Sequence, residues 1–457
     1  MEKLQEECGV FGIYNNDTFD CAKLSYYALY ALQHRGQQSC GIAINDNGTI
    51  INHKDIGIVS EVFDEVVLKH LSGGKIGLAQ CRYSQNETHK RENAQPLTSK
   101  YVKGSITIAY NGVLINKEEL REELEQNGAI FQSGNACEIM AYLIARERLK
   151  TGSIEEAILG VMPKLKGAFS VLVMSPQKLL AFRDPNGMKP LALGKVENSY
   201  LLASETCAFD SVGGSYVRDL KPGELIMIDK DGVHTYEKYC GHCSNMCVFE
   251  YIYFARPDSL VEGSSVYQAR KEAGRILAQE HPVDADLVIG VPDSGLYAAI
   301  GYAEESGIPY GMGFIKNKYI GRTFIQPLQS ERENSVRIKL NALKSAVKGK
   351  RIIMVDDSIV RGTTCKHIVT LLREAGAVEV HVRISSPPFL YPCYFGTDVP
   401  SSDVLVACNN SMEEICELIG ADSLGYLSID GVNRIVGPVT DNYCKGCFTG
   451  KYPIPVK

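Results

Sequence analysis

The segment Arg351-Ile-Ile-Met-Val-Asp-Asp-Ser-Ile-Val-Arg-Gly-Thr-Thr364 decides the fold class of the second half of the chain. Its apolar residues, Ile352 to Val355, are typical of a buried parallel strand. Asp356 and Asp357 follow at the carboxyl end, where open α/β sheets bind ligands. A small, hydroxyl-rich loop then leads into a predicted helix and turns backbone N–H groups toward an anion. The segment therefore predicts a sugar-phosphate site; paired aspartates that only cap a strand are the plainer alternative.

Around this segment, the second half of the chain alternates between predicted strands and predicted helices. Alternation of this kind favours a parallel sheet with helices on its faces, so we expect an α/β domain. The predicted strands cover residues 286–291, 308–315, 352–355 and 378–384, and the predicted helices cover residues 296–305 and 365–374.

The first half has a different pattern, with short β-rich runs separated by turns and only a few helices. Asn116 with Glu119, and Ser153 with Glu156, have the capping-box spacing of two helix starts. The change of pattern predicts two domains, with a boundary between residues 230 and 250. The sequence has no internal repeat.

Length and composition limit the classes of function. The chain has 457 residues, 45% of them hydrophobic and 22% charged, which suits a globular protein with two cores. A net charge of -6 without a basic stretch argues against nucleic acid as a partner. No apolar run reaches the ~20 residues that cross a bilayer. The acidic amino end lacks the apolar core of a secretory signal, and fifteen cysteines without such a signal favour a reduced, cytoplasmic location.

The segment from Arg351 to Thr364 resembles the phosphoribosylpyrophosphate (PRPP) loop of the type I phosphoribosyltransferases. The resemblance implies that Asp356 and Asp357 hold the ribose hydroxyls and, with Ser294, a Mg²⁺ ion. A flexible basic loop beginning at Lys316 would close over pyrophosphate, although these residues alone would suit a solvated surface loop. The other PRPP-binding residues that the resemblance implies are Ser358, Arg361, Gly362, Thr363, Thr364, Arg322, Arg332 and Lys339.

A second segment with chemical content is Glu7-Cys-Gly-Val-Phe-Gly-Ile13. If residues 1–7 were removed as a propeptide, Cys8 would carry both a thiol and a free α-amine. An α-amine titrates near pH ~7.7–8.0 and can act as the base for the thiol on the same residue. A buried strand cysteine is the plainer interpretation.

Cys8 and three further motifs resemble the class II glutamine amidotransferase domain, which is an amino-terminal-nucleophile hydrolase. The resemblance implies that the Cys8 thiol attacks the side-chain amide of glutamine. The three motifs cover residues 32–37, 81–83 and 109–112.

The same resemblance implies the residues that surround the nucleophile. Asn111 and Gly112 would form an oxyanion hole, in which each donor contributes ~2.7–4 kcal/mol in other enzymes. Arg82 would clamp the substrate carboxylate, and Arg35 would bind glutamine beside Gly112. An Asn-Gly pair between alternating apolar residues is also typical of a type I′ hairpin turn.

Together, the two halves resemble the glutamine PRPP amidotransferase family from Cys8 to Tyr452. The resemblance implies a propeptide at residues 1–7, an amino-terminal-nucleophile αββα sandwich at residues 8–235, and a type I phosphoribosyltransferase parallel-sheet domain at residues 236–457. It also implies the transfer of ammonia from glutamine to PRPP, which gives 5-phosphoribosylamine, glutamate and pyrophosphate at the first step of purine synthesis. Purine nucleotide inhibitors and a cytoplasmic homotetramer are expected on the same ground.

The sequence departs from the family pattern in the glutamine pocket. The family has an aspartate that pairs with the substrate α-ammonium group, and Ala136 occupies that position here. Gln85 and Gln38 replace a threonine and a glutamate of the pattern. Loss of one partner of a buried charge pair costs ~2–5 kcal/mol, unless Glu138 or Glu87 substitutes. An ammonia-dependent transferase with an impaired or repurposed glutaminase domain is therefore an alternative, and a PRPP- or purine-sensing regulator is an alternative of another class.

The cysteines near the carboxyl end suggest a metal site. Spacing alone gives two Cys-x-x-Cys pairs, at residues 240–243 and 444–447, and so predicts structural zinc. The family resemblance implies instead a [4Fe–4S] cluster that joins distant parts of the chain. The four ligands of that cluster would be Cys247, Cys393, Cys444 and Cys447.

Overall fold

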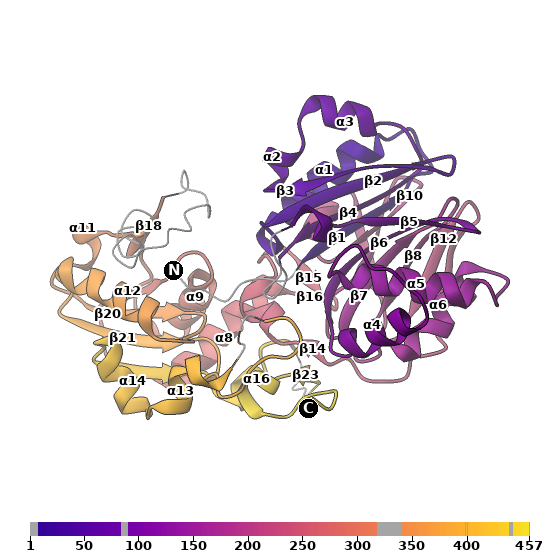
Figure 1. The fold of residues 1–457 in the computed structure, drawn as a ribbon. Helices are drawn as coiled ribbons and strands as arrows, with labels where there is room; N and C mark the ends of the chain where they lie inside the picture. The colour runs from indigo at the N-terminus through magenta and orange to yellow at the C-terminus, as the bar shows by residue number, and fades with distance from the viewer. Residues whose placement is uncertain are drawn as a thin grey trace.

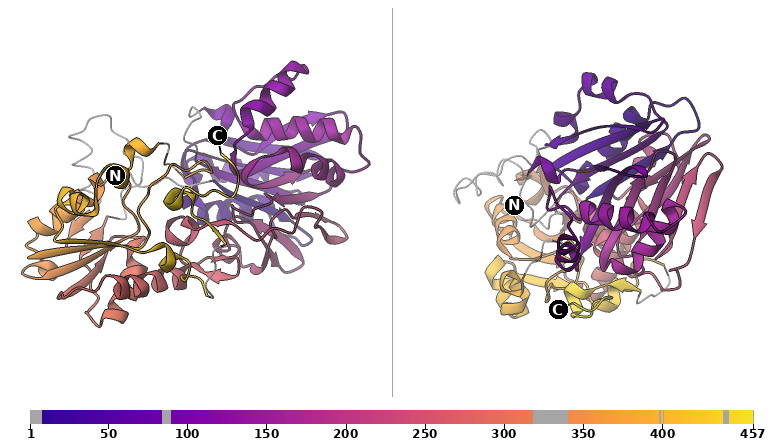
Figure 2. Two further views of the ribbon diagram at one scale, coloured as in Figure 1. Left: turned by 90° about the horizontal axis from the view of Figure 1, so that it is seen from below. Right: turned by 45° about the vertical axis from the view of Figure 1, so that its right-hand side comes forward.

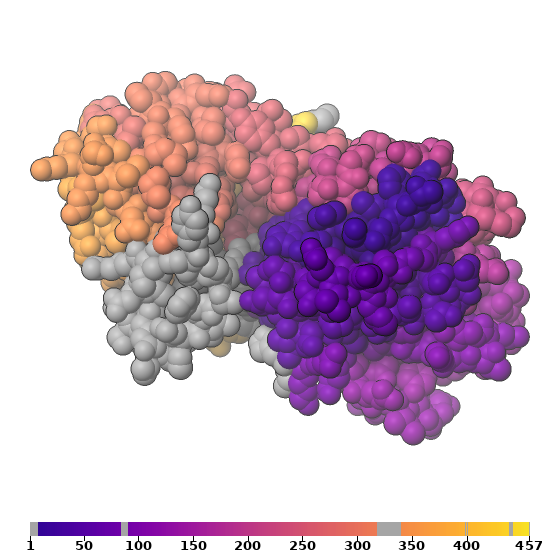
Figure 3. All heavy atoms as spheres, turned by 90° about the horizontal axis from the view of Figure 1, so that it is seen from above, coloured from indigo at the N-terminus to yellow at the C-terminus, as the bar shows by residue number. Residues whose placement is uncertain are grey.

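The computed structural model describes residues 8–83, 90–317, 340–397, 399, 401–437 and 442–456. The first half of the chain forms one lobe with two antiparallel sheets, and the second half forms another lobe around a parallel sheet (Figure 1). The space-filling view shows the two lobes side by side, with the amino-terminal half in indigo and violet and the carboxyl-terminal half in orange (Figure 3).

A seven-stranded antiparallel sheet carries the segment that follows Cys8. All residues of β1 (Gly9–Tyr14) are buried, so this strand lies in the interior of the sheet between β10 and β4. In sheet order the strands are β11 (Ser215–Asp219), β9 (Ala192–Val196), β10 (Ser199–Ala203), β1, β4 (Ile76–Arg82), β2 (Ser39–Asp46) and β3 (Thr49–Ile56).

A six-stranded antiparallel sheet packs against the first. Apolar side chains from both sheets, among them Val10, Leu78, Leu172 and Ile226, form one buried layer between them. In sheet order its strands are β13 (Gly232–Tyr236), β12 (Leu225–Asp229), β8 (Leu179–Arg183), β7 (Gly167–Met174), β6 (Gly104–Leu114) and β5 (Leu97–Tyr101).

Helices cover the outer face of each sheet and complete an αββα sandwich (Figure 1). Two separate apolar cores lie between the helices and the sheets, so the domain has three buried layers, and the expected fold is confirmed. The first sheet is covered by α1 (Cys21–Ala31), α2 (Val59–Val62) and α3 (Glu65–Leu71), and the second by α4 (Lys117–Gln126), α5 (Ala136–Arg148) and α6 (Ile154–Val161).

The capping boxes expected at two of these helices are only partly present. Ser153 accepts a hydrogen bond from the Glu156 amide, as expected for an N-cap. Asn116 precedes α4, but its side chain instead bonds the backbone of Lys164 and Lys166. The spacing predicted both helix starts correctly and the cap of α4 wrongly, because a neighbouring loop competes for the Asn116 amide.

A four-stranded parallel sheet forms the core of the second domain, as predicted. Helices α8 (Val266–Glu280) and α9 (Gly295–Ser306) pack on one face, and α12 (Thr363–Glu374) and α14 (Met412–Ile419) on the other. In sheet order the strands are β17 (Leu287–Gly290), β20 (Arg351–Asp356), β21 (Glu379–Ile384) and β22 (Ser423–Tyr426).

One predicted strand, over residues 308–315, does not join this sheet. It contributes only a single bridge, between Val288 and Tyr310. The end of the segment forms β18 (Phe314–Lys316), which pairs in antiparallel fashion with β19 (Leu340–Ala342). The cause is local: Pro309 lacks an N–H donor, and two glycines, Gly311 and Gly313, weaken a ladder.

The carboxyl-terminal segment lies between the two domains (Figure 2). Its residues Ile454 and Val456 pack with Ala168 and Met188 of the sandwich, and β14 (Met246–Cys247) pairs in parallel with β23 (Tyr443–Cys444). The proposed domain limit at residue 235 lies at the end of β13 and remains a prediction. The short elements are η1 (Gln33–Arg35), η2 (Arg91–Asn93), η3 (Met162–Lys164), α7 (Cys207–Asp210), η4 (Glu250–Phe254), β15 (Leu260–Val261), β16 (Ser264–Ser265), α11 (Lys344–Val347), η5 (Ser402–Val404), α13 (Val406–Asn409), α15 (Ile429–Val432) and α16 (Gly446–Thr449).

Candidate active sites

The first candidate site lies at the carboxyl end of β20. The apolar run of this strand is buried, and the chain leaves the sheet at Asp356 and Asp357, which are 4% and 5% exposed. The Asp357 amide donates to the Asp356 carboxylate over 2.9 Å, and the Ser294 hydroxyl donates to Asp357. The structure thus brings together the three residues expected to hold Mg²⁺. Their oxygens are the hard ligands that this ion prefers.

The loop after these aspartates is shaped for an anion. Gly362, with φ +80°, ends the loop in the left-handed region that favours glycine. Helix α12 begins immediately after it, and no side chain caps its first turn. The free N–H groups of Thr363 and Thr364 and the helix dipole therefore suit a phosphate group, as the resemblance implies. Ser358 donates to Asp357, and Arg361 is exposed beside the loop.

A close backbone contact places Ser294 beside Asp357. A side chain on Gly295, the first residue of α9, would meet the Val355 carbonyl at 2.3 Å. Glycine at this position therefore lets α9 start directly against β20. Lys316, at the end of β18, pairs with Asp293. The other expected loop residues, Arg322, Arg332 and Lys339, lie outside the described residues.

The second candidate site lies where β1, β4 and β6 meet. The Cys8 thiol is 9% exposed and donates to the Tyr83 carbonyl at 3.2 Å. Gln80 lies opposite Val10 in the sheet, and its amide donates to the Tyr110 carbonyl at 2.8 Å. The bond joins β4 to β6 at Tyr110, the residue before Asn111. Strand β4 also pairs with β1, which follows Cys8.

Asn111 and Gly112 lie inside β6, opposite Ser170 and Phe169, so the alternative of a hairpin turn is wrong. Asn111 is fully buried, and in the described part of the chain neither its Oδ1 nor its Nδ2 has a hydrogen-bond partner. A buried amide without partners costs free energy, which a bound ligand would recover. Gly112 has φ +132°, and a side chain there would meet the Ala168 carbonyl at 2.0 Å.

Asp184 supports the strand behind Gly112. Its carboxylate accepts from the amides of Phe169, Asn186 and Met188 at 2.9–3.1 Å. Complete burial raises the pKa of Asp184 to about 6, although Arg183 and these amides oppose the shift. Asp184 therefore joins β7 to the turn that follows β8.

Arg35 has a different position from the one expected for a glutamine ligand. Its guanidinium is fully buried and bonds Glu250 through two nitrogens, at 2.7 and 2.9 Å, and Glu205 at 2.6 Å. Its Nε donates to the Cys8 carbonyl at 3.3 Å. With these carboxylates occupying its donors, Arg35 positions the nucleophile. Direct contact of Arg35 with glutamine stays a prediction.

Glu205 and Glu250 are buried partners of Arg35 that the sequence analysis did not predict. Burial alone would raise the pKa of Glu205, but His34 and Arg35 hold it well below its usual range. Its second oxygen accepts from Arg256 and Ser259 of the other domain, each at 2.8 Å. Both glutamates belong to stretches that resemble the family, at residues 203–210 and 250–254, and that resemblance was the available signal.

The pocket expected for the amino-acid end of glutamine is rich in cations. Arg82 ends β4 and is 6% exposed. Burial lowers the pKa of Lys54, Cys137 opposes that shift, and Arg91 and Arg82 add to it. Lys54 and Arg82 are therefore close enough to repel each other.

The expected acidic partner is missing from the described part of this pocket. Ala136 is fully buried at the start of α5. Glu138 lies within electrostatic reach of Lys54, but its two oxygens already accept from the Gln132 amide and from the amide and hydroxyl of Ser133 at 2.7–2.9 Å. Gln85 and Glu87 lie outside the described residues.

Four cysteines from distant parts of the chain line one enclosed pocket. Burial raises the pKa of the Cys247 thiol, and the neighbouring thiols of Cys444 and Cys393 add to that effect. Burial likewise raises the pKa of the Cys447 thiol, and the neighbouring thiols of Cys393, Cys247 and Cys444 add to that effect. Lys189, which is 1% exposed, also lines the pocket; burial lowers the pKa of its amine, and the neighbouring Cys247 and Cys393 oppose that shift. The pocket is lined by Met188, Lys189, Cys247, Cys393, Phe395, Thr397, Cys444, Cys447 and Tyr452.

The zinc alternative is not favoured by this arrangement. Cys243 is exposed and Cys240 is half-buried, and neither lines the pocket. Within the described ranges, no three His, Cys, Asp or Glu side chains are placed to hold a single metal ion. The four thiols that line the pocket are the other expected ligand set, Cys247, Cys393, Cys444 and Cys447.

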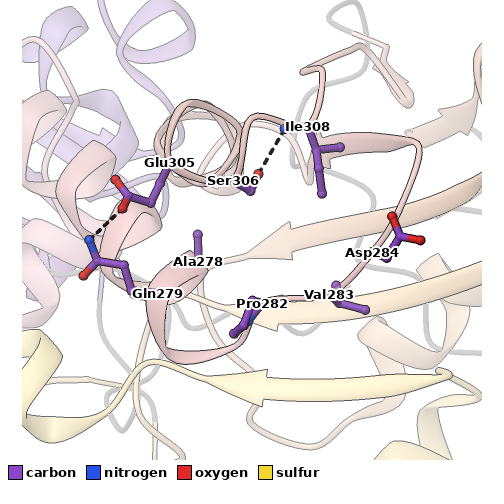
Figure 4. Close-up of a pocket in the computed structure, with 8 residues that line it drawn as sticks. All are labelled: Ala278, Gln279, Pro282, Val283, Asp284, Glu305, Ser306 and Ile308. Atoms are coloured by element: carbon purple, nitrogen blue, oxygen red, sulfur yellow. Dashed lines mark hydrogen bonds between the residues drawn. The ribbon is translucent and has the colours of Figure 1, made fainter.

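A surface cavity of about 490 Å³ lies elsewhere, at the carboxyl-terminal ends of α8 and α9 (Figure 4). It faces the start of β17, at the opposite edge of the sheet from Asp356. Its polar groups bond one another: Gln279 donates to Glu305 at 2.8 Å, and the Ile308 amide donates to Ser306 at 3.3 Å. The cavity is lined by Ala278, Gln279, Pro282, Val283, Asp284, Glu305, Ser306 and Ile308.

Comparison with known proteins decides the family. Models of a glutamine amidotransferase domain and of a phosphoribosyl transferase domain match residues 81–211 and 263–385. An amidophosphoribosyltransferase of Methanocaldococcus jannaschii is 48% identical and covers 98% of both chains. That of Bacillus subtilis is 46% identical and covers 100% of this chain and 96% of its own. The chain belongs to the amidophosphoribosyltransferase family.

A solved structure agrees with this assignment. The glutamine PRPP amidotransferase of B. subtilis, complexed with ADP and GMP, has a TM-score of 0.90 at 45% identity and covers 98% of this chain and 97% of its own. The amidophosphoribosyltransferase fold is thus shared over both domains. Among the described residues, no helix is long and apolar enough to span a membrane.

Proposed function

We propose that this chain transfers ammonia from glutamine to PRPP, giving 5-phosphoribosylamine, glutamate and pyrophosphate in the first step of purine synthesis. The observation that carries the proposal is the presence of both sites in one chain. Cys8 precedes β1, which contacts the strand β6 that carries Asn111, a buried amide without a partner among the described residues, and Asp356 and Asp357 adjoin an anion loop. Amidophosphoribosyltransferases that match over nearly the whole chain support the same enzyme class.

In the glutaminase half-reaction, the Cys8 thiol forms a bond to the amide carbon of glutamine. The amide oxygen then carries negative charge, which the Asn111 side chain and the Gly112 N–H stabilise. Once residues 1–7 are removed, the α-amine of Cys8 takes the thiol proton and returns it to the leaving nitrogen. The C–N bond breaks, ammonia leaves, and water hydrolyses the thioester to glutamate.

In the transferase half-reaction, ammonia forms a bond to C1 of the ribose and the C1–O bond to pyrophosphate breaks. Asp356 and Asp357 hold the ribose hydroxyls, and the loop ending at Gly362 holds the 5-phosphate. Together with Ser294, the two aspartates would hold Mg²⁺, whose charge offsets that of the pyrophosphate. Arg322, Arg332 and Lys339 remain proposed pyrophosphate ligands, together with Lys316.

The four cysteines of the enclosed pocket would hold a [4Fe–4S] cluster. Their convergence from residues 247, 393, 444 and 447, with Lys189 among them, supports this proposal. Such a cluster would tie the carboxyl-terminal segment to the sandwich domain. Protein prepared without oxygen should be brown and contain four iron atoms per chain. Colourless protein with stoichiometric zinc would contradict it.

Purine nucleotides are the proposed inhibitors. The support is the complex of the B. subtilis relative with ADP and GMP. A homotetramer and a cytoplasmic location remain predictions from the family resemblance.

Pyrophosphate release from PRPP and Mg²⁺ tests the proposal when glutamine and ammonia are compared as nitrogen donors. We expect release with both donors. Release with neither would contradict the proposed enzyme and favour a PRPP- or purine-sensing regulator, which should catalyse no release.

A second candidate function is an ammonia-dependent transferase whose amidotransferase domain no longer uses glutamine well. The hydrogen-bonded carboxylate of Glu138, together with Ala136, favours it, because the α-ammonium of glutamine then meets the cations Lys54 and Arg82 with only a carboxylate that already accepts three hydrogen bonds nearby. Release with ammonia alone would establish this function.

A further inference from the structure

Arg270 is a buried arginine that bonds the ends of one short turn. It lies on α8 and is 5% exposed. Its Nε donates to the Tyr251 carbonyl at 2.8 Å, and its Nη2 donates to the Ala255 carbonyl at 2.7 Å. Tyr251 lies within the π-helical turn η4 and Ala255 follows it directly; this conformation is rare and is common at functional sites. In the described part of the chain, no carboxylate bonds Arg270.

The turn that Arg270 holds reaches the glutaminase nucleophile. Glu250, the first residue of the turn, is fully buried and bonds Arg35 through both of its oxygens. Arg35 in turn bonds the Cys8 carbonyl. A shift of the turn would therefore move the backbone that carries the thiol.

Helix α8 is also fixed to the transferase site. It crosses α9 in direct backbone contact, because side chains on Gly274 and Gly301 would each meet a carbonyl of the other helix at 1.8 Å. Helix α9 begins just after Ser294, which bonds Asp357. A rigid crossing of this kind transmits displacement, because packed elements do not deform continuously.

A carboxylate of the transferase site contributes to the electrostatics of Arg270. Burial lowers the pKa of Arg270, and among the groups that oppose this shift Asp357 is the largest, followed by Glu205. One buried guanidinium thus lies within electrostatic reach of a carboxylate from each active site.

We propose that Arg270 is a positioning residue that couples the two active sites. It holds the turn that carries Glu250, and the polyanion bound at Asp357 changes the field on its guanidinium. The two carbonyl bonds then carry the response to Glu250, Arg35 and Cys8. The proposal rests on the proposed function, and it assigns to Arg270 no contact with a substrate.

Alkylation of Cys8 by iodoacetamide tests the coupling, with and without PRPP and Mg²⁺, on the full chain. Mass spectrometry of the Cys8 peptide gives the rate of alkylation, and pyrophosphate release with ammonia reports the transferase alone. Arg270→Lys keeps the charge but reaches one carbonyl, and Arg270→Met removes both bonds. Arg383→Lys is the matched control, because Arg383 is 4% exposed and also donates to a carbonyl, that of His281, at 2.9 Å.

We expect PRPP to change the Cys8 alkylation rate at least tenfold in the unmodified chain and in Arg383→Lys. In both Arg270 variants the change should fall to less than threefold, while ammonia-dependent release stays within threefold of the unmodified chain. An equal PRPP effect in all chains would overturn the proposal. So would a PRPP effect absent from the unmodified chain, or a parallel loss of ammonia-dependent release in both Arg270 variants. Absence of any pyrophosphate release from the unmodified chain would instead contradict the proposed enzyme.

Discussion

The transferase and glutaminase sites differ in how the chain assembles them. Asp356, Asp357 and the anion loop come from one continuous segment, with Ser294 added from the start of α9. The glutaminase site collects Cys8 and Asn111 from different sheets. A site made from one strand and one helix can be deduced from local sequence. A site made from sheet register needs the three-dimensional structure.

The two sites also differ in whether the expected substrate-recognition groups are present beside the expected reacting groups. In the transferase site, the expected residues Ser294, Asp356 and Asp357 are present and joined by hydrogen bonds. In the glutaminase site the reacting groups are present, whereas the pocket for the amino-acid end has Ala136 and a Glu138 that already accepts three hydrogen bonds. The comparison teaches that the catalytic and recognition parts of a site can vary separately, since they lie on different elements.

The largest expected effect is a loss of glutamine-dependent activity without a loss of ammonia-dependent activity. Cys8→Ala should lower glutamine-dependent pyrophosphate release by about 10³-fold or more, because the covalent route is lost. Ammonia-dependent release should remain within twofold, since the thiol plays no part there. Steady-state rates with each donor check this, and an equal loss with both donors would break the separation.

The reverse experiment uses Asp357→Asn. We expect a loss of about 10²-fold or more with either donor, because a charge that holds ribose and Mg²⁺ is removed. Glutamine hydrolysis without PRPP should stay within threefold. Glutamate release measures this, and Asp258→Asn, an exposed aspartate near the domain junction, is the control for a simple loss of surface charge.

Restoring an acidic side chain at position 136 tests how the site recognises the α-ammonium group of glutamine. Ala136→Asp should lower the KM for glutamine about 30-fold, corresponding to ~2 kcal/mol for one regained buried charge pair. Ala136→Asn has nearly the same size without the charge and should change the KM less than threefold. Equal KM values in all three chains would mean that Ala136 does not lie against the α-ammonium group.

The last expected effect is on stability and concerns Asp184, whose pKa is raised to about 6 by burial. Because an unfolded aspartate titrates near pH ~3.9, the folded chain binds more protons between these values. Its contribution to the free energy of unfolding should therefore be greatest below pH ~4 and fall by about 3 kcal/mol as the pH rises through 6. Urea denaturation at pH 4.5 and 7 should show a smaller difference in Asp184→Asn than in the unmodified chain.

The sequence predicted the elements of the parallel domain well, because Ile352 to Val355 and the glycine-threonine loop obey local rules. It failed at residues 308–315, where a proline and two glycines outweigh the apolar pattern. The sequence also left open a hairpin turn at Asn111, because the turn preference of an Asn-Gly pair depends only on neighbouring residues. The partner strand that keeps this pair inside β6 lies over fifty residues away.

Buried charge was the feature least visible in the sequence. Arg35 lies in a motif that suggests a substrate ligand, yet its partners Glu205 and Glu250 lie 170 and 215 residues further along. Such pairs depend on tertiary packing, which neither spacing nor periodicity reports. The same holds for Arg270, whose helix has an ordinary amphipathic sequence.

The pairing of Arg35 with Glu250 has a consequence for dissection of the chain. A fragment that ends near residue 235 retains Arg35 but lacks Glu250, so a buried cation would be left with only part of its countercharge. Stranding a buried charge in this way costs ~3–5 kcal/mol, a large share of the stability of a typical domain. An isolated amidotransferase half should therefore be poorly soluble when expressed alone, and a Glu250-bearing peptide supplied in trans should improve its recovery.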